Sequence, residues 1–118
     1  MARTAKEITD AYYAGWRNGE WKDGQFDKDL LDPDNFSFIG PMEQFDNRDA
    51  FVLTLLNMVG PNMAIGEVHR VFVDGNDVCT IYDCSAGPVT VTMAEWFHVE
   101  NGRITQIRLF FDTKKLEQ

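Results

Sequence analysis

Residues 89–112 read VTVTMAEWFHVENGRITQIRLFFD. Two runs within this stretch, Val89–Val99 and Ile104–Asp112, alternate in side-chain character with the period of a β-strand. They flank Asn101-Gly102, the dipeptide most favourable for a two-residue hairpin turn. The stretch therefore predicts an antiparallel hairpin.

Two further strands are predicted just before this hairpin. Val68–Val73 and Val78–Ser85 alternate in the same way, and the turn-forming sequence DGND joins them at residues 74–77. Ala86-Gly87 supplies the turn into the hairpin. Residues 68–112 thus predict a four-stranded antiparallel meander.

The first half of the chain has helical periodicity. Thr4 and Glu7 form a capping-box pattern for a helix that we expect to end near Asn18-Gly19. A short second helix is expected over residues 26–31, and a third over residues 51–59.

The remaining signals connect these helices. Asp32-Pro33 ends the second helix, Asp46-Asn47 caps the third, and residues 36–39 and 42–45 predict short strands. Helices followed by a meander predict an α+β fold with three helices on one face of the sheet.

Length and charge limit the classes of protein. The 118 residues fit a single domain, residues 1–118, and 44% of them are hydrophobic. A formal charge of −8 disfavours nucleic acid and anionic membranes as partners. The first seven residues lack the apolar core of a signal peptide, which favours a cytoplasmic location. Cys79 and Cys84 are spaced for opposite faces of one strand, so no disulfide is expected.

The turns also predict which side chains share a face. Pairing Val99 with Ile104, Cys79 with Ala94 and Phe72 with Cys79 gives one face with large apolar groups near its centre, and we assign it to the helices. The other face, with Glu95 opposite Arg108 as a cross-strand pair, is apolar for a surface that faces water. A second copy of the chain is expected to cover it, giving a homodimer.

Several segments resemble, in order and spacing, the nuclear transport factor 2-like superfamily and its SnoaL-like branch. They are Asn18–Trp21, Leu30–Phe36, Phe38–Pro41, the helix start at Phe45–Asn47, and Glu100–Ile104 leading to Phe110–Asp112. The resemblance covers almost the whole chain. It implies a cystatin-like cone, in which a strongly curved antiparallel sheet wraps around the helices and leaves a pocket. Superfamily members include ketosteroid isomerases, polyketide cyclases, epoxide hydrolases, dehydratases and non-catalytic binders.

The chain lacks carboxylates at the positions that carry the catalytic carboxylates in the family members it resembles. Tyr12 matches the tyrosine that donates to an oxyanion in isomerase-like members. The positions of their general base and of their protonated aspartic acid fall on Phe38 and Ala94, and the cyclase aspartate falls on Leu109. These three side chains cannot transfer a proton.

Other polar groups on the predicted inner face become the catalytic candidates. Asp83 is expected to act as acid or base, Arg70 as its ion-pair partner, and Tyr12 or His98 as a donor. The equally simple alternative is that Asp83 and Arg70 form a structural ion pair. The predicted ligand-binding residues are Trp16, Phe38, Met58, Thr92, Trp96, Leu109 and Phe111.

Two functions fit these expectations. One is a lyase, isomerase or cyclase that acts on a small, mainly apolar metabolite and needs no cofactor. The other is a non-catalytic ligand-binding or dimerisation module with the same fold. No group of Cys, His, Asp and Glu has metal-ligand spacing, so no metal site is predicted.

Overall fold

A computed structural model describes residues 3–17, 27–59 and 62–116 of the chain. Its centre is a six-stranded sheet with strand order β2-β1-β6-β5-β4-β3. The strands are β1 Ser37–Ile39, β2 Gln44–Phe45, β3 Met63–Asp74, β4 Asp77–Ala86, β5 Val89–Glu100 and β6 Arg103–Phe110. The α+β class and the β3–β6 meander are confirmed.

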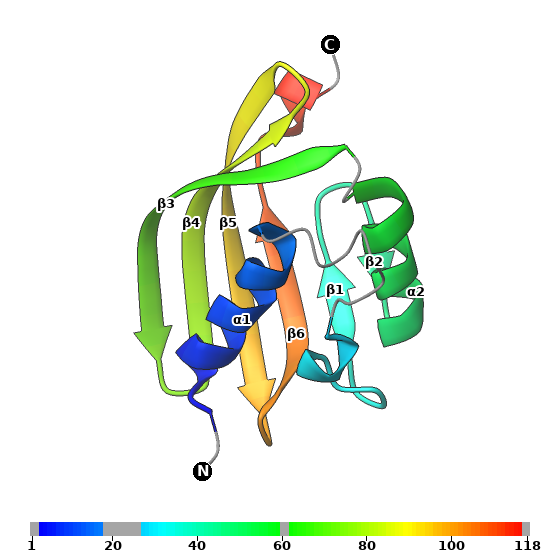
Figure 1. The fold of residues 1–118 in the computed structure, drawn as a ribbon, viewed down its shortest axis with the longest axis vertical. Coiled ribbons are helices and arrows are strands. Elements are labelled where there is room, and N and C mark those ends of the chain that lie inside the picture. Colours follow the sequence, from blue (N-terminus) through cyan, green and yellow to red (C-terminus); the bar gives the residue numbers. More distant parts are fainter. Residues whose placement is uncertain (1–2, 18–26, 60–61, 117–118) are drawn as a thin grey trace.

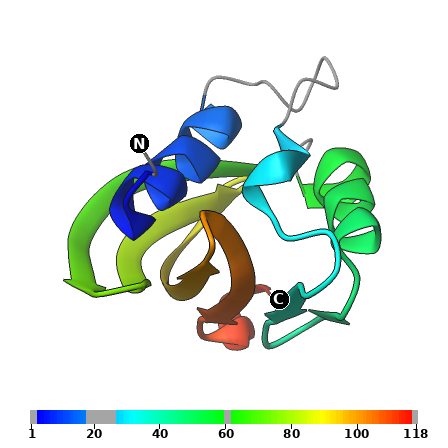
Figure 2. The same cartoon turned by 90° about the horizontal axis from the view of Figure 1, so that it is seen from below.

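The helices lie against one side of this sheet (Figure 1). Helix α1 spans Ala5–Arg17 and packs across β3 to β6, while α2, Arg48–Thr54, lies beside β1 and β2. Figure 2 shows the sheet curving around α1, as the predicted cone requires. Within the described ranges there is no helix long and apolar enough to cross a membrane.

The prediction of three helices is not confirmed. Of the predicted second helix, the described residues form a single 3-10 turn, η2, at Lys28–Leu30. The predicted third helix is α2 followed by a π-helical turn, η3, at Leu55–Val59. The expected helix end at Asn18-Gly19 lies outside the described residues.

Both predicted helix caps are confirmed. The Thr4 amide donates to Glu7 Oε1 at 2.9 Å, and the Glu7 amide donates to Thr4 Oγ1 at 3.1 Å. Asn47 Oδ1 accepts a hydrogen bond from the Ala50 amide at 3.0 Å. These bonds satisfy amides that have no partner within a helix's first turn.

One strand pair departs from the expected antiparallel sheet. β1 pairs with β2 antiparallel but with β6 in parallel, with Phe38 opposite Ile107. This pairing carries the sheet beyond the meander and brings Phe38 into the core, where it is 8% exposed. The aromatic residues of β1 and α2 therefore pack beside the meander, with Phe38 and Phe51 stacked at 4.8 Å between ring centroids.

Irregularities in two strands, and a shift of two residues between β4 and β5, change the predicted registers. Cys79 pairs with Trp96 and not, as predicted, with Ala94. Val99 pairs with Ile104 as expected, but His98 pairs with Gln106, so Thr105 is an extra residue in β6. In β3, Phe72 pairs with Cys79 and Arg70 with Ile81 as predicted, whereas Val68 pairs with Tyr82 instead of Asp83. Each irregularity shifts the side chains beyond it to the other face.

The assignment of inner and outer face is consequently wrong for β4 and β5, and for Arg70 and Phe72 on β3. Cys79, Ile81 and Asp83 point away from the helices, as do Thr92 and Trp96. The buried residues are those of the opposite face: Val78, Thr80, Tyr82 and Cys84 on β4, and Val91, Met93, Glu95, Phe97 and Val99 on β5. The extra residue in β6 explains the error, because it places Ile107 and Leu109 on the same face as Phe97 and Glu95.

The two cysteines lie on opposite faces of β4, which confirms that part of the prediction. Cys84 is buried beneath the helices and Cys79 is half-buried on the outer face, and both are free thiols.

Candidate functional site

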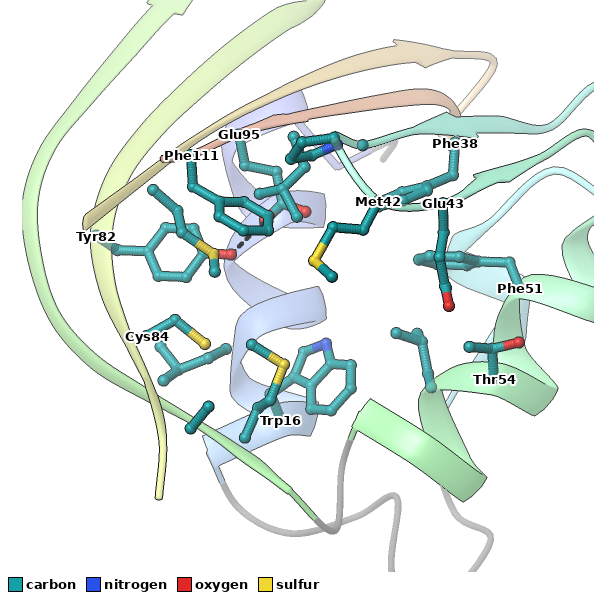
Figure 3. A pocket seen from close by; sticks show the side chains of 18 of the residues that line it. Trp16, Phe38, Met42, Glu43, Phe51, Thr54, Tyr82, Cys84, Glu95 and Phe111 are labelled. Atoms are coloured by element: carbon teal, nitrogen blue, oxygen red, sulfur yellow. Dashed lines mark hydrogen bonds between the residues drawn. The ribbon is translucent and has the colours of Figure 1, made fainter. Parts of the chain in front are cut away.

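A cavity of about 380 Å³ lies between the concave face of the sheet and the helices. This volume is within the range of small-molecule sites. Its lining is mostly apolar and aromatic, and it includes Tyr12, Trp16, Phe38, Phe45, Phe51, Leu55, Met63, Ile65, Met93, Leu109 and Phe111. Figure 3 shows the lining side chains converging from α1, α2 and the strands.

The cavity has an exposed side and a buried side. Met42, in the turn between β1 and β2, is 63% exposed, and the adjacent Glu43 is also exposed. Glu95 and Tyr82 are 4% and 5% exposed. Figure 3 places these two across the cavity from Glu43 and Thr54. The β1–β2 turn therefore borders the mouth, and Glu95 lies at the deep end.

Glu95 is the buried carboxyl of this cavity. Tyr13 Oη donates a hydrogen bond to its Oε1 atom at 2.6 Å, and Tyr82 Oη donates to the same atom at 3.0 Å. Burial raises the pKa of Glu95 to about 7, although both hydrogen bonds lower it. The carboxyl is therefore poised between its two protonation states near neutral pH, as an acid–base catalyst must be.

Other titratable groups around Glu95 stay neutral at that pH. Burial raises the pKa of Tyr12, Tyr13 and Tyr82 above the ordinary tyrosine value. Burial likewise raises the pKa of the Cys84 thiol to about 11. Tyr12 also has a hydrogen bond with Trp16.

The structure separates the predicted catalytic residues. Tyr12 lines the cavity, but Asp83, Arg70 and His98 do not. Asp83 Oδ1 accepts from Thr92 Oγ1 at 2.8 Å and lies 2.9 Å from His69 Nε2, and these partners lower the pKa of its carboxyl. The predicted Asp83–Arg70 ion pair is wrong, because Arg70 Nη1 donates instead to the backbone oxygen of His69.

His98 also belongs to the outer face. Its Nδ1 atom lies 2.8 Å from Asp77 Oδ1, which also accepts from Trp96 Nε1 at 2.9 Å. The Asp77 contact raises the pKa of His98. This cluster ties the start of β4 to β5 and is remote from the cavity.

The predicted ligand-binding residues divide in the same way. Trp16, Phe38, Leu109 and Phe111 line the cavity, whereas Thr92 and Trp96 lie on the outer face. Met58 belongs to η3, and its side chain lies outside the described part of the structure.

Sequence reasoning assigns Glu95 and Tyr82 to the outer face, and it does not select Tyr13 as a site residue. Glu95 was interpreted as the partner of Arg108, but Arg108 pairs with Trp96 and donates from Nη2 to Ser37 Oγ at 3.1 Å. A signal was present in β5, where Glu95 is the one charged residue in the alternating series Val91, Met93, Glu95, Phe97, Val99. A lone carboxyl in an apolar series marks a buried ionisable group.

One group on the outer face has metal-ligand chemistry. Single ligand atoms of Glu67, His69 and Asp83 all lie within 4.8 Å of one another. His69 already contacts both carboxylates, at 3.3 Å to Glu67 and 2.9 Å to Asp83. The contacts of the His69 ring with the two carboxylates thus hold the three groups together.

The fold and the cavity place the chain among the nuclear transport factor 2-like proteins. Its structure is similar to an NTF2-like protein of unknown function from Cytophaga hutchinsonii, with a TM-score of 0.84 and 25% identity over 100% of this chain and 98% of that one. It is also similar to a proposed ketosteroid isomerase from Kribbella flavida, with a TM-score of 0.78 and 17% identity over 95% and 82%.

A third similar structure is an LEH-like epoxide hydrolase from M. tuberculosis, with a TM-score of 0.74 and 22% identity over 96% of this chain and 86% of that one. No curated protein matches the sequence. The model of the SnoaL-like domain matches residues 9–107, and the chain therefore belongs to the SnoaL-like family.

Proposed function

We propose that this protein is a small-molecule lyase, isomerase or cyclase in which Glu95 moves a proton to or from a mainly apolar substrate. The observation that carries the proposal is a carboxyl with a pKa of about 7 in the wall of an apolar cavity. At neutral pH, a carboxyl with such a pKa both gains and loses a proton at a small cost in free energy. The structural neighbour described as a proposed ketosteroid isomerase supports this class of reaction.

The two tyrosines define how the carboxyl works. Both donate to Oε1 of Glu95, so a proton on the carboxyl resides on Oε2. As a base, Oε2 accepts a proton from the substrate, and the electron pair of the broken bond stays on the substrate. As an acid, it returns the same proton at another atom. The net result is an isomerisation, a ring closure or an elimination.

The test is incorporation of solvent deuterium into candidate substrates. A panel of small apolar ketones, epoxides, alcohols and amines is incubated with the protein in D2O and followed by NMR. We expect exchange or turnover with the wild type and a loss of at least about 100-fold with Glu95→Gln. Turnover that is unchanged by Glu95→Gln would overturn the role of Glu95. Ligands that bind without exchange or turnover would assign the cavity to a non-catalytic binding module.

We also propose a homodimer through the outer face of the sheet. Phe72 and Phe110 are each 59% exposed there, and Ile39 is 41% exposed. Half-buried Ile81, Ala94 and Trp96 lie between them in the sheet. Light scattering should give twice the mass of the chain at micromolar concentration, and Phe72→Asp should give a monomer. A monomeric wild type would contradict this interface.

A further inference from the structure

The charged groups of the cavity lining are all acidic in the described structure. Glu95 lies at the deep end and Glu43 at the mouth, and no described lining residue is Lys, Arg or His. The chain as a whole has a formal charge of −8. An anionic ligand would meet repulsion on approach and find no described countercharge inside, whereas a cation would be attracted at both stages.

The hydrogen-bonding groups at the deep end point to the same ligand chemistry. The hydroxyl protons of Tyr13 and Tyr82 are both donated to Glu95 Oε1. Ionised Glu95 has acceptor capacity left on Oε2 and no proton to give. A ligand group that donates hydrogen bonds therefore complements this end better than a carbonyl or a carboxylate.

Aromatic rings surround the carboxyl on several sides. Tyr13 and Tyr82 lie edge to face with ring centroids 5.3 Å apart, and Tyr12 lies 5.6 Å from Tyr13. Figure 3 shows Phe111 beside Glu95, and Trp16 farther along the same cavity lining. Rings of this kind attract organic cations through their negatively charged faces, most strongly where water is excluded.

We propose that the substrate or ligand of this cavity is a lipophilic amine, bound as its ammonium ion beside Glu95 with its hydrocarbon part against the aromatic walls. The proposal rests on the function proposed above and names its substrate class. In that reaction the transferred proton is an N–H proton: the N–H bond breaks, its electron pair stays on nitrogen, and an O–H bond forms on Glu95. The neutral amine so released is a nucleophile suited to ring closure.

Binding of an ammonium ion should be linked to loss of a proton from Glu95. The titratable groups that face Glu95 are Tyr12 and Tyr13 from α1, and Tyr82 and Cys84 from β4, with Cys79 on the far side of that strand. All have raised pKa values and stay neutral near pH 7. A cation favours the ionised carboxyl, so protonated Glu95 loses its proton when the amine binds.

The experiment compares three probes of nearly equal shape by calorimetry at pH 7: 4-phenylbutylamine, 4-phenylbutan-1-ol and 4-phenylbutyrate. We expect the amine to bind about tenfold more tightly than the alcohol, and the carboxylate to bind most weakly. Heats measured in buffers of different ionisation enthalpy should show release of about half a proton per amine, because the pKa of Glu95 is about 7.

Two carboxylate-to-amide variants locate the effect. Glu95→Gln should lose both the preference for the amine and the proton release, while circular dichroism shows an intact fold. Asp83→Asn makes the matching chemical change on the outer face of β4, outside the cavity lining, and should retain both. The proposal is overturned if the alcohol or carboxylate binds as tightly as the amine, or if the amine preference survives in Glu95→Gln.

The outcomes also separate this proposal from the proposed reaction. Glu95-dependent turnover of a neutral substrate, together with no amine preference, would support the enzymatic role of Glu95 and contradict an amine as the ligand. A Glu95-dependent amine preference with no turnover of any amine in the panel would support the amine as the ligand and contradict the enzymatic role.

Discussion

Glu95 and Asp83 lie on neighbouring strands, one on each face of the sheet, and their pKa values are shifted in opposite directions. Both carboxyls accept two hydrogen bonds from side chains. Burial outweighs these bonds at Glu95 and raises its pKa, whereas the bonds from His69 and Thr92 prevail at the partly exposed Asp83 and lower its pKa. Equal numbers of hydrogen bonds therefore do not give equal acidity, because the face of the sheet decides the larger contribution.

The largest expected effect is on the pH dependence of stability through Glu95. Its folded-state pKa is raised from 4.5 to about 7. Its stabilising contribution is thus fully present below pH 4.5 and is lost as pH rises through 7. Each pKa unit corresponds to about 1.4 kcal/mol, so the wild type should lose about 3 kcal/mol of unfolding free energy between about pH 4 and pH 8 relative to Glu95→Gln.

Urea denaturation of both proteins across this pH range measures the difference. The glutamine side chain of the variant keeps the shape of the carboxyl and an oxygen that accepts from Tyr13. If the unfolding free energies of the two proteins changed in parallel over the whole pH range, burial would not be raising the pKa of Glu95.

A smaller effect is expected when one tyrosine donor is removed. Tyr13→Phe deletes the 2.6 Å hydrogen bond to Glu95, which stabilises the ionised form, so the pKa of Glu95 should rise by about one further unit. Tyr82→Phe deletes the longer bond of 3.0 Å and should raise it less. Carbon NMR of the labelled Glu95 carboxyl reads both values. A fall in the pKa of Glu95 in either variant would contradict the assigned donors.

The smallest effect is expected on the outer face. The pKa of Asp83 is lowered in the folded state, so its contribution is present above the unfolded-state pKa and is lost as pH falls through the folded-state value. Asp83→Asn should slightly destabilise the protein at neutral pH and approach the wild type in acid. Binding and turnover in the cavity should not change. A collapse of turnover in Asp83→Asn would restore Asp83 as the catalytic residue and reverse the comparison.

Local sequence signals predicted the elements well but not the faces of the sheet. The Asn101-Gly102 turn forms with positive φ at both residues, 53° and 78°, and Thr4 and Asn47 cap the two helices. These features depend on neighbours within a few residues, so the sequence specifies them directly. Trp16, Phe38, Leu109 and Phe111 were likewise predicted in the cavity lining.

The catalytic candidates depended on register, which is not local. An ideal ladder from the Asn101-Gly102 turn pairs Glu95 with Arg108 and turns both outwards, whereas the observed ladder pairs Glu95 with Leu109. The difference of one residue moved the carboxyl from the predicted surface to the core. Nothing in residues 98–106 marks the irregularity by composition, since Thr105 is an ordinary strand residue.

Thr105 also has an evolutionary consequence. Val99 opposes Ile104 and His98 opposes Gln106, so β6 has one residue more than β5 between these two pairs. That residue is Thr105. In a relative that lacks this one residue, β5 and β6 would pair without a bulge. Ile107 and Leu109 would still lie beneath the helices. Alignments drawn without a gap here would then equate inward residues of one protein with outward residues of the other. Catalytic assignments transferred along such alignments would choose the wrong side of the last strand.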